Sequence, residues 1–228
     1  LPFSVLGPVG RTVDDAYMLL QAQAGTDPHD PFSIAPLPDL YSPLEQADLG
    51  SIRAMITPDL GSAAMSNAYR SIFAERSGLF RHHFAAAIDA SPDFTEGDNC
   101  FEVLRGVNFV AAHGARVRDH RNDLSPNVVD NVDRGLAYSL ANVAEAHLQQ
   151  SRIARAWLDL FEDIDVVICP AASSTPFPHD QWSVGEIDGK AMETYMRWLG
   201  ITYLPTMALA CGVALPCGLD QAGMPFGI

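Results

Sequence analysis

Apolar residues recur at helical spacing in several stretches, and these stretches predict most of the secondary structure. In residues 12–24 the apolar side chains at positions 13, 16, 17 and 20 share one helix face. Thr12 and Asp15 resemble a capping box at the start of this helix, and Gly25 is suited to end it. Further helices are predicted at residues 63–76, 80–90 and 101–112.

The longest helical pattern begins at Ser125 and Pro126, an N-cap residue followed by proline at the first helical position. Apolar positions continue to residue 161, so the pattern predicts one long helix or two consecutive helices. His147 falls within this pattern, and we interpret it as a partly buried residue of the helix face rather than a base.

Short apolar runs predict strands at residues 52–57, 164–169 and 213–217. The run at 164–169 is apolar almost throughout, which is typical of a strand buried on both faces in a central sheet. Residues 224–228 are expected to pair with the preceding run as a hairpin across the turn at 218–223. Helices alternate with short buried strands, so the predicted fold class is α/β.

The stretch from residue 26 to residue 51 is rich in proline and aspartate and predicts a surface loop. No repeat, low-complexity tract or linker divides the chain, so residues 1–228 are predicted to form one domain. Leu1 is not methionine and opens an apolar segment, while residues 223–228 read as a turn entering an unfinished strand. We therefore expect a domain that is truncated at both ends. A sheet edge left open in this way favours self-association, for which a homodimer is one form.

The composition of the chain, above all its negative net charge, disfavours several classes of function. The 228 residues are 48% hydrophobic and 18% charged, and 14 basic residues face 28 acidic ones, for a net charge of −14. So acidic a chain is unsuited to nucleic acid or to anionic membranes, and no apolar run reaches the roughly 18 residues of a membrane span. The four cysteines show no paired framework and no signal peptide is visible, so buried thiols and a cytoplasmic location are expected.

The candidate chemistry is sparse. Ser173, Ser174 and Thr175 follow the apolar strand at 164–169, where α/β proteins place ligands. No glycine-rich turn exposes them, so they suit the wall of a cleft better than the role of nucleophile. Lys190, the one lysine in the chain, lies in a turn-like Asp-Gly-Lys segment and is interpreted as a solvated charge. The histidines lack metal-ligand spacing, and no metal or cofactor motif is present.

Several segments, taken in order, resemble the C-terminal half of the amidase signature family. They are GPVGRTVDDA at residues 7–16, GTDPHDP at 25–31, the strand and DLG at 52–61, LSP at 124–126, FEDIDVVICP at 161–170 and LPCGLDQAGMPFG at 215–227. Each motif is moderately specific, and the match covers essentially the whole chain.

The resemblance implies a large mixed β-sheet flanked by helices and the hydrolysis of carboxylic amides by a Ser–cis-Ser–Lys triad without a metal. In the family the triad precedes the segment that matches residues 7–16, so the resemblance assigns no catalytic residue to this chain. It implies that the chain borders the acyl pocket of a small-molecule amide. Ser173, Ser174 and Thr175 would lie at the rim, and Trp198 and Met207 would line the pocket. Packing in the core is an equal alternative for Trp198.

Two departures from the family pattern bear on function. Residues 206–211 read TMALAC where many members carry N-x-x-G-x-P, which leaves the substrate open. Trp198 and Leu199 stand where tRNA-dependent amidotransferase subunits of the family usually show Asn-Asp, which favours a free-standing amidase. The alternatives are a catalytically inactive amidase-like binding module and an amidotransferase A-type subunit.

Overall fold

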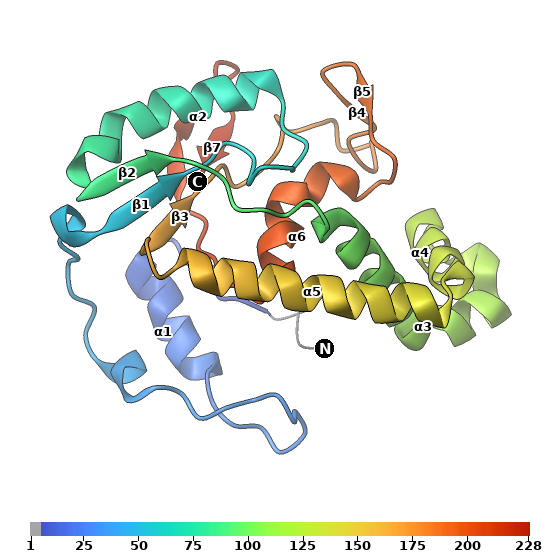
Figure 1. The fold of residues 1–228 in the computed structure, drawn as a ribbon. Coiled ribbons are helices and arrows are strands. Elements are labelled where there is room, and N and C mark those ends of the chain that lie inside the picture. Colours follow the sequence, from blue (N-terminus) through green and yellow to red (C-terminus); the bar gives the residue numbers. More distant parts are fainter. Residues whose placement is uncertain (1–5) are drawn as a thin grey trace. The chain divides into compact units, whose positions relative to one another are not determined.

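A parallel three-stranded sheet organises the larger part of the chain. The computed structural model describes residues 6–228, and the chain divides into two units, residues 1–48 and 49–228. In the second unit the strand order is β2-β1-β3, with β1 at Arg53–Ile56, β2 at Ala86–Asp89 and β3 at Val166–Ile168 (Figure 1). Both neighbours run parallel to β1. The α/β prediction is confirmed.

The central strand of this sheet is β1, whose residues Ala54, Met55 and Ile56 are all buried. Within residues 6–228, β3 pairs with β1 alone, and its three residues are only partly buried. The prediction that residues 164–169 form a strand is confirmed. Its interpretation as a strand buried on both faces is wrong for the described chain, because Val166, Val167 and Ile168 all remain partly exposed.

Residues 80–90 do not form the predicted helix. Helix α2 covers Asn67–Phe80, a single turn of 3₁₀ helix covers Arg81–His83, and β2 covers Ala86–Asp89. Pairing with β1 satisfies backbone hydrogen-bonding groups of β2. The Arg81 side chain also holds β2, because it donates to the Ala87 carbonyl at 3.1 Å and to the Asp89 carboxylate at 2.7 Å. Tertiary pairing therefore overrides the helical spacing here.

The start of α2 also lies later than predicted. Ser66 is its N-cap, and the Ser66 hydroxyl accepts a hydrogen bond from the Tyr69 amide at 3.2 Å. Residues 63–65 remain outside the helix because Ser66, and not the alanines before it, supplies the capping oxygen.

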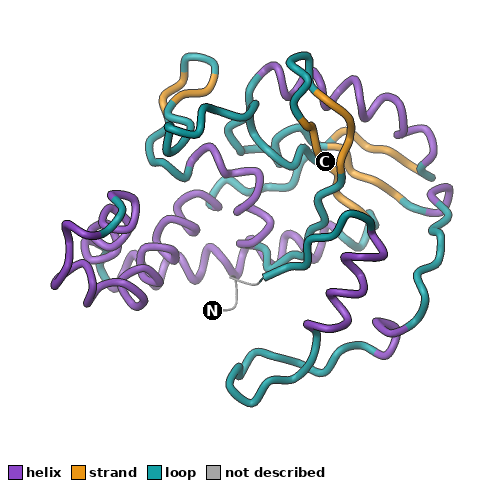
Figure 2. The backbone as a smooth tube through the Cα atoms, turned by 180° about the vertical axis from the view of Figure 1, so that it is seen from behind, coloured by secondary structure: helices purple, strands orange, loops and turns teal. Residues whose placement is uncertain are grey.

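Four helices form a second cluster beside the sheet, seen from behind in Figure 2. They are α3 at Gly97–His120, α4 at Pro126–Ala137, α5 at Leu140–Leu160 and α6 at Gly200–Met207. The long pattern after Ser125 thus resolves into two helices. Ser139 and Asn142 form a complete capping box at the start of α5, which explains the break. His147 on α5 is exposed, so its interpretation as a partly buried residue is wrong.

Two further sheets in residues 6–228 are short antiparallel hairpins. One joins β4 at Glu186–Ile187 to β5 at Lys190–Ala191, and the other joins β6 at Pro216–Leu219 to β7 at Pro225–Gly227. The second confirms the predicted hairpin, although its first strand begins later than residue 213. Asp220 shapes its turn by accepting hydrogen bonds from the Ala222 and Met224 amides, both at 2.8 Å.

The first unit contains α1 at Val13–Gln23, with Thr12 as its N-cap. The Thr12 hydroxyl accepts from the Asp15 amide at 3.1 Å, while the Asp15 carboxylate pairs with Arg11 at 3.2 Å instead of completing the capping box. No side chain between residues 6 and 48 is buried, so the described part of this unit has no core of its own. The apolar opening at residues 1–5 lies outside the described residues.

Arg53 and Asp165 fix the start of β1 against the start of β3. The Arg53 amide and guanidinium donate to the Asp165 carboxylate at 2.7 and 3.0 Å, and the Asp165 amide donates to the Arg53 carbonyl at 2.8 Å. These hydrogen bonds from Arg53 lower the pKa of Asp165 to about 2.

We predict that Asp165→Asn weakens the dependence of stability on pH in acid. The depressed pKa means that this carboxylate stabilises the fold above its unfolded pKa of about 3.9, and that the stabilisation is lost as the pH falls toward 2. Urea unfolding between pH 5 and 2 measures the slope. Asp163→Asn, at an exposed neighbour, is the control. Equal slopes for the wild type and Asp165→Asn would contradict the prediction.

Helices α3 and α4 cross at two glycines. A Cβ on Gly135 would lie 2.3 Å from the Gly106 carbonyl oxygen, whereas a Cβ on Gly114, further along α3, would meet only a Val110 methyl group at 3.7 Å. The backbones approach closely because neither crossing residue has a side chain.

We predict that Gly135→Ala lowers the free energy of unfolding by about 2–3 kcal/mol, because the helices must separate. Gly114→Ala adds a methyl group to the same pair of helices without a clash, and it should be neutral or stabilising by up to about 1 kcal/mol. Urea unfolding midpoints of the two variants test this prediction. A Gly135→Ala protein as stable as the wild type would show that the crossing tolerates a side chain.

Candidate functional site

The loops that follow the three parallel strands meet at one edge of the sheet. Thr57, after β1, and Ser91, after β2, share a hydrogen bond between their hydroxyls at 2.7 Å. The Ser66 amide, at the end of the loop after β1, donates to the Ser173 carbonyl in the loop after β3 at 2.9 Å. Ligands of open α/β sheets bind outside the carboxyl ends of the strands, so this edge is the candidate site.

Of the three hydroxyl residues predicted at a pocket rim, Ser173 is almost completely buried, Ser174 partly buried and Thr175 exposed. The Ser173 hydroxyl has no hydrogen-bond partner among residues 6–228, and Ser174 donates to the Thr175 carbonyl at 3.3 Å. A buried hydroxyl without a base beside it is not activated as a nucleophile.

Trp198 and Met207 occupy different surroundings. The Trp198 ring meets the edge of Phe177, two residues after Thr175, at 5.4 Å between centroids, so the structure brings Trp198 to the loop after β3. Met207 is fully buried on α6, with its sulfur 3.6 Å from the Cys100 sulfur on α3. The substrate-binding role of these five residues stays a prediction.

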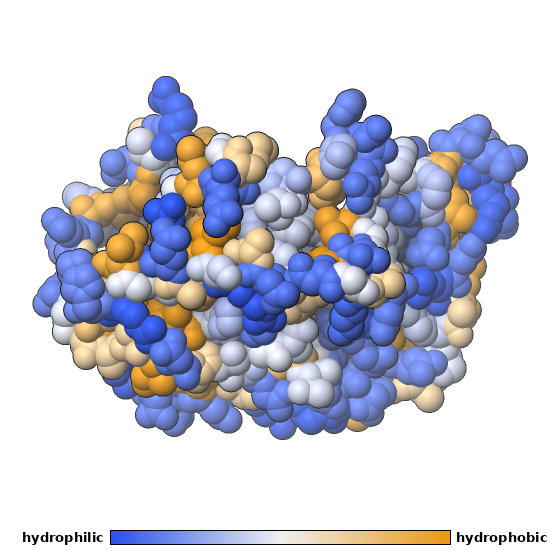
Figure 3. Space-filling view, turned by 90° about the horizontal axis from the view of Figure 1, so that it is seen from above, coloured by the Kyte–Doolittle hydropathy of each residue, from blue (hydrophilic) through white to orange (hydrophobic). Residues whose placement is uncertain are grey.

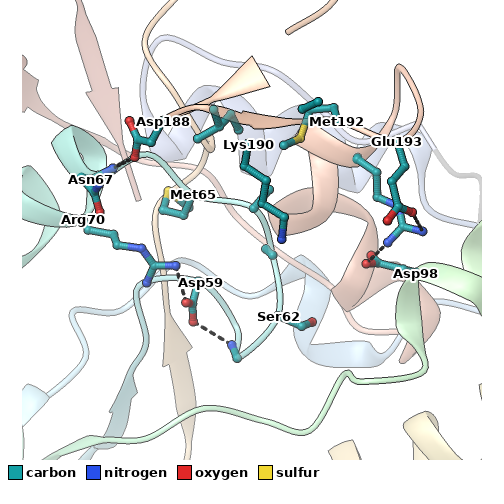
Figure 4. Close-up of a pocket in the computed structure, with 16 residues that line it drawn as sticks. Asp59, Ser62, Met65, Asn67, Arg70, Asp98, Asp188, Lys190, Met192 and Glu193 are labelled. Carbon is teal, nitrogen blue, oxygen red and sulfur yellow. Dashed lines mark hydrogen bonds and ion pairs between the residues drawn. The ribbon is translucent and has the colours of Figure 1, made fainter. Parts of the chain in front are cut away.

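A cavity of about 480 Å³ opens at the same edge of the sheet, between the loop after β1 and the β4–β5 hairpin (Figure 4). It is lined by Asp59, Gly61, Ser62, Ala63, Ala64, Met65, Asn67, Arg70, Asp98, Ile187, Asp188, Lys190, Ala191, Met192, Glu193 and Arg197. The five predicted residues are all described, and none of them lines this cavity. Its volume is typical of a small-molecule site.

The β4–β5 hairpin beside the cavity was not predicted from the sequence, although its Asp-Gly turn is a recognisable signal. Asp188 and Gly189 both have positive φ, 49° and 81°, as a tight hairpin turn requires, and an Asp-Gly pair is a strong sign of such a turn. Lys190 is exposed, as predicted, but it follows this turn directly and so borders the cavity.

Ion pairs hold the walls of the cavity together. Arg70 on α2 pairs with Asp59 at 2.6 Å. Arg197 pairs with Asp98 and, at 3.0 Å, with Glu102, both on α3. Burial lowers the pKa of Arg197, but the two carboxylates outweigh it, so the pKa lies above its usual value. Arg197 therefore stays charged and ties the segment after the hairpin to α3.

The aromatic hydroxyl of Tyr203 completes this network by donating to Asp98 at 2.5 Å. Burial, and then the hydrogen bond to Asp98, raises the pKa of Tyr203, so the phenol remains a donor at neutral pH. The Tyr203 ring stacks on Phe101 with centroids 4.0 Å apart, which joins the polar network to the core between α3 and α6.

The cysteines offer no obvious nucleophile at this edge. Burial raises the pKa of Cys169, directly after β3, to about 11 and that of Cys100 to about 12, so both remain thiols at neutral pH. Cys217 is partly buried, and Cys211 is exposed, which corrects the prediction of four buried thiols. Within residues 6–228 no three His, Cys, Asp or Glu side chains are grouped so as to hold a metal ion.

The surface contains both hydrophilic and apolar regions. Figure 3 shows a largely hydrophilic face with apolar patches between the polar side chains. None of the described helices has the length and hydropathy to span a membrane.

Comparison with known proteins identifies the family. A family model described as Amidase matches residues 2–228. The chain belongs to the amidase family. The resemblance seen in the motifs is therefore confirmed.

The amidase relatives include enzymes of two kinds. An acylamidase from Rhodococcus erythropolis is 22% identical over 97% of this chain and 47% of its own length. The A-type subunit of the glutamyl-tRNA(Gln) amidotransferase from Gloeobacter violaceus is 27% identical over 97% of this chain and 49% of its own. The chain spans about half the length of the curated relatives it matches.

A solved structure supports the fold. A bacterial aryl acylamidase of the amidase signature family matches with a TM-score of 0.79 and 19% identity, over 97% of this chain and 49% of that one. At this identity the likeness shows the fold alone, and it confirms the predicted amidase signature fold.

We predict that Arg197→Met lowers the free energy of unfolding by about 2–3 kcal/mol, because it leaves Asp98 and Glu102 partly buried without their cation. Arg118→Met is the matched control, since Arg118 pairs with Asp119 at an exposed position and should cost less than about 1 kcal/mol. Urea unfolding at neutral pH measures both changes. Similar small losses in the two variants would show that the Arg197 network contributes little.

Proposed function

We propose that the whole protein hydrolyses a carboxylic amide to an acid and ammonia or an amine, with this chain forming the substrate side of the site. The family match along residues 2–228 is the observation that carries the proposal. Family members of the amidase signature type use a Ser–cis-Ser–Lys triad that precedes the segment matched by residues 7–16. We therefore place the catalytic groups of the whole protein upstream of this chain.

The chemistry of the described residues supports this division of labour. An amide nucleophile needs a base that removes its proton and donors that stabilise the oxyanion. The Ser173 hydroxyl has no partner among residues 6–228, and Cys100 and Cys169 remain protonated at neutral pH. None of these groups is activated for attack. We propose Ser173, Ser174, Thr175, Trp198 and Met207 as contributors to the acyl pocket.

In the proposed reaction, the upstream lysine accepts the proton of the nucleophilic serine through the bridging serine. The serine attacks the amide carbonyl, the amine leaves with a proton, and water then releases the acid from the acyl-enzyme. This chain holds the acyl group and excludes bulk water. No metal takes part in the proposed mechanism.

An amidotransferase A-type subunit is the second candidate, because several such subunits are relatives at 25–28% identity. Two features favour the free-standing amidase. Trp198 and Leu199 replace the usual Asn-Asp of the amidotransferase subunits, and a net charge of −14 disfavours approach to tRNA. An inactive amidase-like binding module is the third candidate, and it predicts a whole protein without the triad.

Activity of the whole gene product and of the 228-residue chain should differ completely. We expect the whole protein to release amine or ammonia from members of a panel of simple amides and anilides, and the chain alone to show no turnover above buffer, because it lacks the triad. Release of product is measured by amine detection and by chromatography of the acid.

Two outcomes would contradict this proposal. Turnover by the chain alone would place a catalytic group within residues 1–228. A whole protein that contains the triad yet is active only with partner subunits, glutamine and charged tRNA would identify an amidotransferase.

A further inference from the structure

The cavity beside the β4–β5 hairpin contains seven charged side chains, of which six have protein partners. Arg70 and Asp59 pair with each other, and Arg197 pairs with Asp98 and with Glu193, the latter at 3.2 Å. Asp188 accepts a hydrogen bond from the Asn67 amide at 2.6 Å, at the first turn of α2. These groups have little capacity left for a ligand.

Lys190 is the exception. Its side chain makes no ion pair or hydrogen bond to any residue in 6–228. Figure 4 shows this side chain extending from the hairpin into the cavity, toward the loop after β1. Lys190 is thus the one cation of the described cavity wall whose charge a protein carboxylate does not already compensate.

The backbone of the opposite wall does not provide a phosphate cradle. The Gly61 amide donates to the Asp59 carboxylate at 2.8 Å, and the Ser62 and Ala63 amides donate to the Asp59 carbonyl at 3.2 and 2.9 Å. A dianion would meet a single available cation beside four carboxylates. A monoanion needs only that one cation.

Beside the polar residues Ser62 and Asn67, the wall contains apolar side chains that suit the body of an organic molecule. Ala63, Met65 and Ile187 are buried at its base, and Met192 is partly buried beside the hairpin. An organic carboxylate would place its anionic end at Lys190 and its hydrocarbon part against these side chains.

We propose that this cavity binds an organic monocarboxylate, with the Lys190 ammonium as its partner. The biological source of the carboxylate rests on the proposed function: it is either the acid that amide hydrolysis releases or a carboxylate borne by the substrate away from the scissile amide. Lys190 is then a specificity-determining residue supplied by the hairpin.

The lone lysine allows a direct test on the 228-residue chain. A water-soluble acetylating ester modifies Lys190 and the N-terminal amine, and peptide mass spectrometry follows each separately. Saturating benzoate or succinamate should slow acetylation of Lys190 about fivefold or more while the N-terminal amine is unaffected. Neutral benzamide should give no protection, and inorganic phosphate should give little.

The two carboxylates distinguish the sources. Protection by benzoate and succinamate alike indicates a site for the acid product, and protection by succinamate alone indicates a carboxylate-bearing substrate. Equal protection by benzamide, strong protection by phosphate, or no protection by either carboxylate would overturn the proposal.

Binding measurements on Lys190 variants test the same proposal without chemical labelling. By calorimetry, Lys190→Met should weaken carboxylate binding about tenfold or more, while Lys190→Arg should keep it within about threefold. Arg155→Met is the matched control, because it removes an exposed cation from α5 outside the cavity. Unchanged affinity in Lys190→Met, or an equal loss in Arg155→Met, would reject the proposal. Because binding and turnover are measured separately, an active amidase that binds no carboxylate here would disprove the inference and leave the proposed function standing.

Discussion

Parallel pairing of β1 with both β2 and β3 is the constraint on which the site depends. Parallel strands bring their carboxyl ends to one edge, so loops that are far apart in sequence meet there. The Arg53–Asp165 contacts fix the register of β1 and β3 at the opposite end. The Thr57–Ser91 and Ser66–Ser173 hydrogen bonds then join the loops at the carboxyl edge. Both the predicted rim residues and the charged cavity lie on these loops or beside them.

A second set of interactions attaches the β4–β5 hairpin region to this edge. Asp188 caps the first turn of α2, and Arg197 binds two carboxylates of α3. The hairpin strands have only two residues each, and these side-chain contacts link the hairpin region to α2 and α3. As a result, the hairpin turn forms one wall of the cavity. Lys190, which the sequence predicts to be a solvated surface charge, extends from this turn into the cavity.

Local signals in the sequence predicted local features. Three local patterns each predict the element that the structure contains at that place. They are the apolar run at 164–169 for a strand, Ser125-Pro126 for a helix start, and residues 218–223 for the turn region of a hairpin. Strand β2 could not be predicted in this way, because Ala86–Asp89 becomes a strand only by pairing with β1. The Arg197 network was equally hidden, since Asp98 lies 99 residues away in the chain. The hydroxyl residues at 173–175 follow strand β3, as predicted, but the burial of Ser173 depends on packing that no local pattern encodes.

The central claim is that this chain forms the substrate side of an amidase and contributes no nucleophile. Reaction of the whole protein with a fluorophosphonate, which phosphonylates an activated serine and releases fluoride, followed by peptide mapping, tests it most directly. We expect a single modified serine in the segment that precedes this chain, and none within residues 1–228. Modification of Ser173 or of any other serine of this chain would contradict it.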